Sequence, residues 1–341
     1  MSANKSYEII KLNAPELSEN EVQVLYSAHS HMVKKYGFLN RIRNADEYKD
    51  NFLSEFDGEG CQLFVLKENG IICGILTFEK GTDWGGNEQY ELGIKLCSKE
   101  INPELTDCLR HFIHKKLGLH DFIAISVYGE LDELINEFSA KIQLTGNTYT
   151  LDKADINVDT LEETAETIQA KNPGLRIQFM DIVPEEHIEQ YCNLFNELMD
   201  DMPDVAEARF VQYIETPENQ VRRNQAIADG NAMIYRYVIF DESNRMIAQS
   251  NVNVGKADTK FPYQFLIGVT KQYRGKNLGK WLYAAMYQKL FNDVDFEKSH
   301  VAHHPTNKHA IAISEWVGYK FAYPETTYIL TNNRNSARIA P

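Results

Sequence analysis

The stretch YQFLIGV-TKQY-RGKNLGK-WLYAAMYQKL, residues 263–290, decides the fold of this chain. Its opening segment is apolar enough for a buried strand, and the apolar positions from Leu278 to Leu290 recur at the spacing of one helix face. The turn between them contains Gly275 and Gly279. In such a turn several backbone N–H groups point at one place, and the start of the helix adds partial positive charge. The stretch therefore predicts a strand, a turn and a helix that bind an anionic group such as a pyrophosphate.

Two familiar phosphate-binding loops do not fit this turn. A P-loop has four residues between its glycines and a Ser or Thr after its lysine, whereas three residues separate Gly275 from Gly279 and Trp281 follows Lys280. The dinucleotide fingerprint G-x-G-x-x-G is absent from the sequence as well. The segment RGKNLG, which begins at Arg274, instead resembles the Arg/Gln-x-x-Gly-x-Gly/Ala loop of the GNAT superfamily. These are acyl-CoA-dependent N-acyltransferases, and the loop holds the pyrophosphate of coenzyme A.

One position of the loop departs from the family pattern. Asn277 stands where the first glycine of the motif usually lies. Asparagine is one of the few residues other than glycine that tolerate a positive φ, and its backbone N–H donates whatever side chain it carries. We therefore expect the loop to keep its anion-binding geometry.

A second segment in the expected order strengthens the resemblance. The sequence NKHAIAISEWVGYKF, residues 307–321, looks like the family's fourth helix, where an asparagine precedes an apolar helix ending in Leu-Gly-Phe; the ending here is VGY. Gly318 is a candidate C-cap of this helix. Asn307 is either a polar contact to the coenzyme or the N-cap of the helix. Ser314 occupies the position of a tyrosine that protonates the leaving thiolate in many relatives.

The order of predicted elements repeats along the chain. Each half begins with a strand and two helices, continues with a β-hairpin and a further strand, and ends with helix, strand, helix and strand. Landmarks such as Pro15 and Pro184 recur about 170 residues apart. This is the element order of the GNAT fold. The chain is therefore predicted to be α+β, with two tandem GNAT-like domains, each a mostly antiparallel, twisted sheet flanked by helices.

We expect the first domain at residues 1–152, a polar and acidic linker at residues 153–173, and the second domain at residues 174–341. The matching segment of the first half, CSKEINP at residues 97–103, lacks the loop motif. Its Glu100 would place a carboxylate at the pyrophosphate, and Pro103 removes a donor N–H. The first domain is therefore predicted to lack coenzyme A binding and to have a supporting role.

The resemblance implies that acetyl-CoA is the co-substrate and enters between two central strands that diverge. Backbone groups near Ile267 and Val269 would pair with the pantetheine arm, and an acceptor amine would attack the thioester directly, helped by positioning and oxyanion stabilisation. Lys276 and Lys280 either touch phosphate or are simply solvated. The coenzyme-binding residues implied in this way are Ile267, Val269, Arg274, Gly275, Lys276, Asn277, Leu278, Gly279, Lys280 and Asn307.

Two residues are candidates for acid–base catalysis. His303 ends the strand beside the cleft, and an imidazole suits general-base duty near neutral pH; the alternative interpretation is an ordinary polar residue at a strand end. Ser314 is the second candidate, because of its place in the fourth helix. The histidines at positions 300, 303, 304 and 309 lack a standard ligand spacing, so no metal site is predicted.

The acceptor side offers carboxylates and aromatic rings. Four acidic residues follow the first helix of the second half, where the family forms its acceptor site, and they either receive a cationic amine or belong to a solvated loop: Asp200, Asp201, Asp204 and Glu207. Three tyrosines either line the same pocket or pack in the ordinary way: Tyr213, Tyr235 and Tyr237.

Composition limits the partners and the compartment. The chain has 341 residues, 43% hydrophobic and 25% charged, and a net charge of −14 that disfavours nucleic acid as a partner. Its five cysteines include no C-x-x-C pair, its N-terminus is polar, and no apolar run reaches membrane-spanning length. We expect a cytoplasmic protein without a membrane partner.

The predicted function is N-acetyl transfer from acetyl-CoA to the amine of a small-molecule acceptor. The alternative is a non-catalytic acyl-CoA-binding or regulatory protein, which Ser314 in place of the tyrosine favours. Acylation of a protein N-terminus or lysine is a third possibility. Mycothiol-synthase-like enzymes share the two-copy layout, and we expect a monomer in which two domains mimic a dimer, or a weak homodimer.

Overall fold

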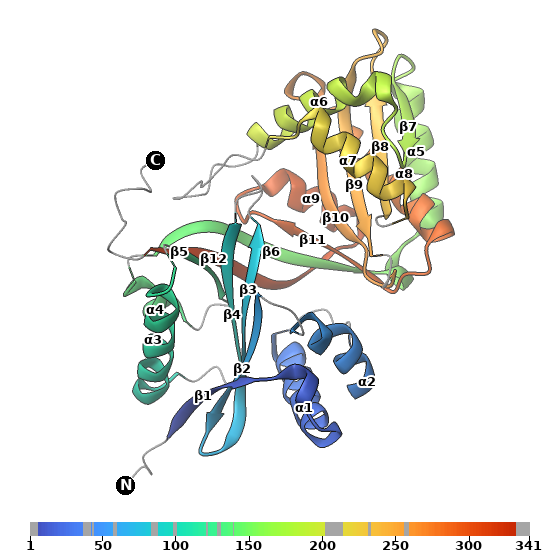
Figure 1. Ribbon diagram of the computed structural model, residues 1–341. Coiled ribbons are helices and arrows are strands. Elements are labelled where there is room, and N and C mark those ends of the chain that lie inside the picture. The colour runs from blue at the N-terminus through green and yellow to red at the C-terminus, as the bar shows by residue number, and fades with distance from the viewer. Residues whose placement is uncertain are drawn as a thin grey trace. The chain divides into compact units, whose positions relative to one another are not determined.

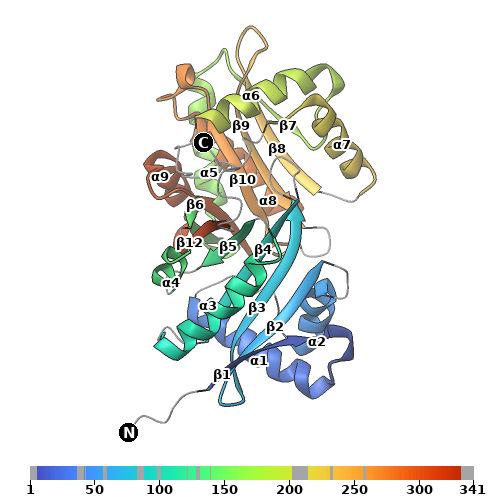
Figure 2. The ribbon, with the colours of Figure 1, turned by 60° about the vertical axis from the view of Figure 1, so that its left-hand side comes forward.

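The computed structural model describes residues 6–36, 42, 44–56, 60–82, 88–97, 101–120, 122–127, 131–138, 140–201, 214–230, 233–255 and 259–331. The chain divides into two compact units, whose elements are labelled in Figures 1 and 2. Unit 1 comprises Met1–Gly146, Val205–Gln212 and Tyr323–Pro341, and unit 2 comprises Asn147–Asp204 and Tyr213–Ala322.

Unit 1 is built on a sheet with the strand order β1-β2-β3-β4-β5-β12. Most neighbours in it are antiparallel, and β4 and β5 are parallel. Its strands are β1 (Tyr7–Leu12), β2 (Cys61–Glu68), β3 (Ile71–Thr82), β4 (Glu88–Leu96), β5 (Phe122–Val127) and the end of β12 (Lys320–Thr331). Asn69 and Gly70 form the tight turn between β2 and β3, with φ of 50° and 84°.

Helices cover both faces of the unit 1 sheet (Figure 1). Side chains of β2 alternate between the faces, so that Phe64 packs in the cluster of α3 while Leu63 packs in the cluster of α1. The helical segments of this half are α1 (Glu19–Tyr36), α2 (Ala45–Glu47), α3 (Pro103–Leu117), α4 (Asp132–Asn136) and the short turns at Ala14–Glu16, Tyr48–Phe52 and Leu53–Phe56.

Unit 2 repeats this plan with the strand order β6-β11-β10-β9-β8-β7. Its helices α6 and α7 lie on one face of the sheet, and α5 and α8 lie on the other (Figures 1 and 2). The strands are β6 (Lys141–Asp152, from Asn147 on), β7 (Arg176–Met180), β8 (Met233–Phe240), β9 (Met246–Val254), β10 (Tyr263–Val269) and β11 (Lys298–His303). The helices are α5 (Val158–Lys171), α6 (Ile188–Asp200), α7 (Pro217–Ala228), α8 (Leu278–Asp293) and α9 (Lys308–Val317), with short turns at Lys153–Asp155, Glu185–His187 and Lys271–Tyr273. The predicted α+β architecture of mostly antiparallel sheets flanked by helices is confirmed.

Two strands run from one unit into the other. Residues 147–152 of β6 pair with β11 in unit 2, whereas residues 326–331 of β12 pair with β5 in unit 1. In each unit, the strand beyond the parallel pair thus comes from the other half of the sequence. The predicted domain ranges are 1–152 and 174–341. Compared with them, residues 147–152 belong to unit 2 and residues 326–331 belong to unit 1, so the two units exchange strand ends.

The predicted linker at residues 153–173 contains helix α5. Asn157 caps its first turn, with Oδ1 accepting from the Thr160 N–H at 3.0 Å. Leu161 and Ile168 of this helix are both buried. Ile168 packs in one cluster with Trp281 of α8, so α5 forms part of the core of unit 2.

Across the part of the chain that the structure describes, every helix is too short or too polar to cross a membrane.

Candidate active site

Strands β10 and β11 diverge soon after they pair. Their parallel pairing is limited to Tyr263 with His300 and Gln264 with Val301. Beyond it, β10 continues beside β9 after a bulge that follows Gln264, and β11 continues beside β6 as far as His303. The predicted divergence of two central strands is therefore present. Ile267 and Val269 lie in the diverging half of β10, beyond its pairing with β11.

The predicted anion-binding turn follows β10. Gly275 has φ of 79°, and Asn277 has φ of 61° and ψ of 19°, so the expected positive φ at Asn277 is confirmed. Helix α8 begins at the next residue, and the first N–H groups of a helix have no partner within it. No side chain caps this end of α8 among the described residues. The turn therefore presents backbone donors together with the positive end of the helix dipole.

Gly279 has a different role from the other loop residues. A Cβ at this position would lie 2.8 Å from Cδ1 of Ile313, so Gly279 allows α8 and α9 to approach closely. Leu278 is also buried, in the cluster that includes α5. These two residues shape the loop by packing.

Asp201 neutralises two cations beside the turn. Its carboxylate pairs with Lys271 Nζ at 2.7 Å and with the guanidinium of Arg274. Arg274 also donates from Nε to the carbonyl oxygen of Val269 at 3.0 Å, which ties the turn to the end of β10. Of the four acidic residues predicted for the acceptor side, Asp201 thus lies with the loop cations. Asp204, Glu207 and the predicted Tyr213 lie outside the described residues.

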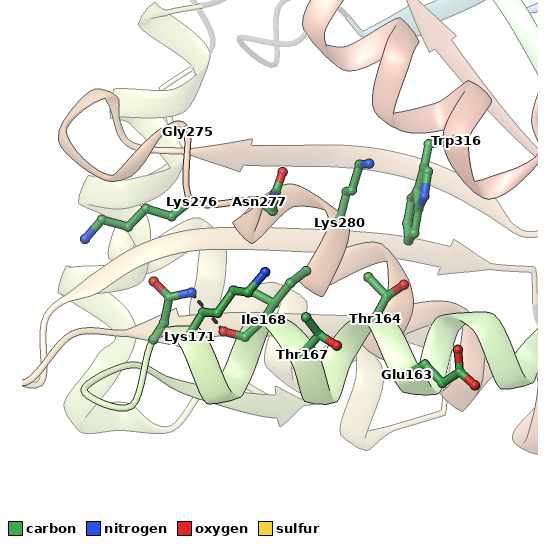
Figure 3. A pocket seen from close by; sticks show the side chains of 11 residues that line it. Glu163, Thr164, Thr167, Ile168, Lys171, Gly275, Lys276, Asn277, Lys280 and Trp316 are labelled. Atoms are coloured by element: carbon green, nitrogen blue, oxygen red, sulfur yellow. Dashed lines mark hydrogen bonds between the residues drawn. The ribbon is translucent and has the colours of Figure 1, made fainter.

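A pocket of about 680 Å³ adjoins the turn. One wall is formed by the turn, Lys280 and Trp316, and the facing wall is formed by α5 (Figure 3). Lys280 Nζ lies 4.9 Å from the ring centroid of Trp316. The pocket contains three lysines, at positions 171, 276 and 280, against one carboxylate, Glu163. Backbone donors and excess positive charge beside the half-buried Trp316 ring suit a phosphorylated nucleotide such as that of coenzyme A.

The α5 wall of this pocket lies in the predicted linker, so the sequence interpretation missed it. The signal available was the Leu161–Ile168 apolar pattern with Lys171 at its end. That pattern identifies a helix, but it does not tell which element the helix packs against.

The two predicted catalytic residues lie in contact and are buried. His303 Nε2 lies 2.7 Å from Ser314 Oγ, and the hydroxyl of Tyr283 on α8 lies 2.7 Å from the same Oγ. Burial lowers the pKa of His303 to about 4, so its imidazole is neutral at neutral pH. Burial raises the pKa of Tyr283, so its phenol stays protonated. Tyr283, Ser314 and His303 therefore form an uncharged hydrogen-bonded chain next to the divergence of β10 and β11.

Four further predicted residues are placed by their contacts or backbone conformation. Asn307 caps α9, with Oδ1 accepting from the Ala310 N–H at 3.2 Å, and Gly318 ends the helix with φ of 112°. Tyr235 and Tyr237 pack against Phe179, with centroids 5.6 Å and 5.4 Å from its ring. Among the described residues no group of three or more His, Cys, Asp or Glu side chains could hold a metal ion.

The equivalent helix of unit 1 is closed by its own cap. Asn102 Oδ1 accepts from the Leu105 N–H at 2.9 Å at the start of α3, and Pro103 occupies the first turn. The described part of this helix start therefore offers fewer free donors than the start of α8. Glu100 lies outside the described residues.

A buried row of polar side chains lies on the α6 face of the unit 2 sheet. Arg236, Gln249 and Asn251 are 1%, 0% and 3% exposed. Arg236 on β8 pairs across the sheet with Asn251 on β9, and Gln249 stands two residues along the same strand. Asn251 Nδ2 donates to the hydroxyl of Tyr191 on α6 at 2.9 Å.

Four atoms in this polar row lack a hydrogen-bond partner among the residues that the structure describes: Arg236 Nε, Gln249 Oε1, Gln249 Nε2 and Asn251 Oδ1. Each such atom costs about 1–3 kcal/mol when it stays unpaired in a core. Their total cost is comparable with the net stability of a domain, about 5–15 kcal/mol. If the row had only a structural role, these unpaired atoms would therefore lower the free energy of unfolding considerably.

No protein-family model matches the chain, and no curated protein is similar to it in sequence. Solved structures do resemble it. One is a tandem GNAT protein from the clavulanic acid biosynthesis pathway, with a TM-score of 0.56, 12% identity, and coverage of 96% of this chain and 98% of that chain. Another is a GCN5-related N-acetyltransferase from Sphaerobacter thermophilus, with a TM-score of 0.57, 9% identity and 95% coverage of both chains.

A third is a GCN5-related glucosamine N-acetyltransferase region of a fungal multi-domain GH3 β-N-acetylglucosaminidase. It has a TM-score of 0.56 and 13% identity, and the match covers 96% of this chain and 38% of that one. These similarities extend over almost the whole chain, and they show that it has the fold of tandem GNAT proteins.

Proposed function

We propose that unit 2 transfers an acetyl group from acetyl-CoA to the amine of a small-molecule acceptor. The observation that carries this proposal is the turn before α8. Gly275 and Asn277 both have positive φ there, and the turn opens onto a pocket with three lysines. The GNAT fold and the divergence of β10 from β11 support the same function.

Each part of the site has a role in this proposal. The N–H groups from Gly275 to Lys280 and the start of α8 bind the pyrophosphate, and Lys171 on α5 adds positive charge. Backbone groups of Ile267 and Val269 align the pantetheine arm. The coenzyme supplies an acyl group activated as a thioester. The protein supplies position and a site from which water is excluded.

Ser314 holds the proton that a leaving thiolate requires. Its Oγ lies between His303 and Tyr283, so Ser314 gives its proton to the thiolate and takes up, through these hydrogen bonds, the proton that the attacking amine loses. A thiol has an ordinary pKa of about 8.5, which makes this protonation favourable at neutral pH. With a pKa of about 4, His303 is a weak base. We therefore assign His303 to this proton chain, and the acceptor amine must arrive in its neutral form.

One observation favours acyl-CoA binding without turnover as the second candidate function. His303 and Ser314 are buried and bonded to each other, and this arrangement suits a structural contact as well as it suits a proton chain.

A thiol-release assay with acetyl-CoA and a panel of amines separates the two functions. Isothermal titration with acetyl-CoA should give one coenzyme site per chain. Turnover with any amine would support the transferase, whereas tight coenzyme binding without turnover of any amine would favour the binding protein. No coenzyme binding at all would contradict both.

A further inference from the structure

The polar row of Arg236, Asn251 and Gln249 has no part in coenzyme binding or in the proton chain. It lies on the face of the sheet covered by α6, whereas Tyr283 lies on α8, on the other face. Buried polar side chains are normally hydrogen-bonded within the protein. The row therefore needs an explanation of its own.

A second buried glutamine in the same sheet shows what a structural glutamine does. Gln264 is 1% exposed, and its Nε2 lies 2.8 Å from the carbonyl oxygen of Leu266 and 3.0 Å from that of Asn251. Its Oε1 accepts from the hydroxyl of Ser250 at 3.4 Å. Gln249 is buried just as deeply, yet neither its Oε1 nor its Nε2 has a hydrogen-bond partner in the described part of the chain. Gln264 thus serves as a control for Gln249, because the two glutamines are equally buried and differ in whether their amide groups are hydrogen-bonded.

Arg236 carries a buried charge, with 1% of the residue exposed. Its guanidinium donates to the carbonyl oxygen of Asp181 and lies 5.6 Å from the ring of Tyr191. Among the described residues, no carboxylate lies within ion-pair distance of it. Arginine is rarely buried unless it is paired, and water does not neutralise its charge. A planar carboxylate is the partner whose geometry matches a guanidinium.

The row also ends beside the proposed reaction centre. Asn251 pairs with Leu266 and Gln249 pairs with Gly268, both in the diverging half of β10. The free amide oxygens, Gln249 Oε1 and Asn251 Oδ1, can accept N–H bonds from an amine at this end. Two strand spacings, about 10 Å, separate the backbone of Arg236 on β8 from that of β10.

We propose that this row binds the acceptor, and that the acceptor is an amine with a carboxylate at its other end. The inference rests on the proposed function and names its substrate class. The carboxylate pairs with Arg236, and the amine is held by Gln249 and Asn251 beside β10. Because the three side chains are at most 3% exposed, the acceptor enters by moving α6 away from the sheet.

The test uses 5-aminopentanoate as the probe, and its control is 5-aminopentanamide, in which a neutral amide replaces the carboxylate. Thiol release with acetyl-CoA should show kcat/KM at least about tenfold higher for the carboxylate, because a buried group left unpaired discriminates strongly. Arg236→Met should remove this preference, and the fold should tolerate the change because it removes an uncompensated buried charge. Equal kcat/KM for the two probes, or a preference that survives in Arg236→Met, overturns the proposal.

Variants of the two glutamines separate an effect on acceptor binding from an effect on folding. Gln249→Leu should reduce kcat/KM for 5-aminopentanoate at least about tenfold without lowering Tm or weakening acetyl-CoA binding, because it removes atoms that have no protein partner. Gln264→Leu, which breaks satisfied hydrogen bonds, should lower Tm. A lower Tm in Gln249→Leu, or unchanged kcat/KM, identifies Gln249 as structural and contradicts the proposal.

Hydrogen exchange tests binding without turnover. In the presence of coenzyme A, 5-aminopentanoate should change the exchange of residues 188–200, and the amide probe should not. If neither probe changes the hydrogen exchange of residues 188–200, the polar row is not the acceptor site. This holds even if acetyl-CoA binds and other amines react. Failure of acetyl-CoA to bind contradicts the proposed function instead, and the two failures remain distinguishable.

Discussion

Replacing Asn277 tests whether the left-handed turn before α8 is the coenzyme site. Asn277 has φ of 61° and ψ of 19°, and its side chain makes no capping hydrogen bond. The residue therefore contributes its backbone conformation and its N–H group. Asn277→Ala keeps the N–H but makes that conformation less favourable, Asn277→Val makes it much less favourable, and Asn277→Gly makes it freely available.

The size of the effect follows from the cost of a left-handed residue. Alanine at this position costs about 1 kcal/mol, and a β-branched residue costs about 2 kcal/mol or more. If the variant turn relaxes in the free protein, this energy appears as weaker binding, about fivefold for alanine and about thirtyfold for valine. If the turn keeps its conformation, the same energy appears as a loss of unfolding free energy. The loss of binding free energy and the loss of unfolding free energy should add up to the cost of the left-handed conformation in that variant.

Isothermal titration with acetyl-CoA and denaturant unfolding measure the two parts on the same variants. Asn277→Gly, the matched control, should bind at least as tightly as Asn277→Ala and about as tightly as the natural chain. If Asn277→Val matches the natural chain in both Kd and unfolding midpoint, the positive φ has no role and the loop assignment is wrong.

Three shorter predictions concern other parts of unit 2. Asp201→Asn should tighten acetyl-CoA binding about two- to fivefold by releasing the two loop cations, and the gain should shrink at high salt; unchanged affinity in low-salt titrations contradicts this. Lys171→Ala on α5 should weaken coenzyme binding severalfold, whereas Lys34→Ala on α1, the control, should not; equal affinities would remove α5 from the site. His303 has a folded-state pKa of about 4, below its ordinary value of 6.5, so the unfolded chain binds the proton first and stability falls as pH drops from 6.5 towards 4. Between pH 7 and 5 this residue should cost about 2 kcal/mol, a loss that His303→Gln should remove in denaturant unfolding at both pH values.

The parts of the site that depend on adjacent residues could be predicted from sequence. The loop motif, the positive φ of Asn277 and the ends of α9 at Asn307 and Gly318 all follow from local backbone preferences. Burial of Leu161 and Ile168 follows from helical spacing in the same way.

Contacts between distant residues could not be predicted from such patterns. Tyr283 has the spacing of an ordinary core residue of α8, and nothing in that spacing shows that its hydroxyl meets Ser314. Asp201 follows α6, and only the fold brings it to the cations of the turn. The exchange of strand ends between units was missed because the alternation of a strand does not name its pairing partner.

That exchange has a consequence for how the chain is made. Translation produces β5 before β6 to β11, and its neighbour in unit 1, residues 326–331 of β12, emerges only after them. Until then the nascent chain has an exposed strand edge at β5, a template for unwanted pairing with other chains. A premature stop shortly before residue 326 would leave the early-made sheet unfinished, although every residue of β1 to β5 is present.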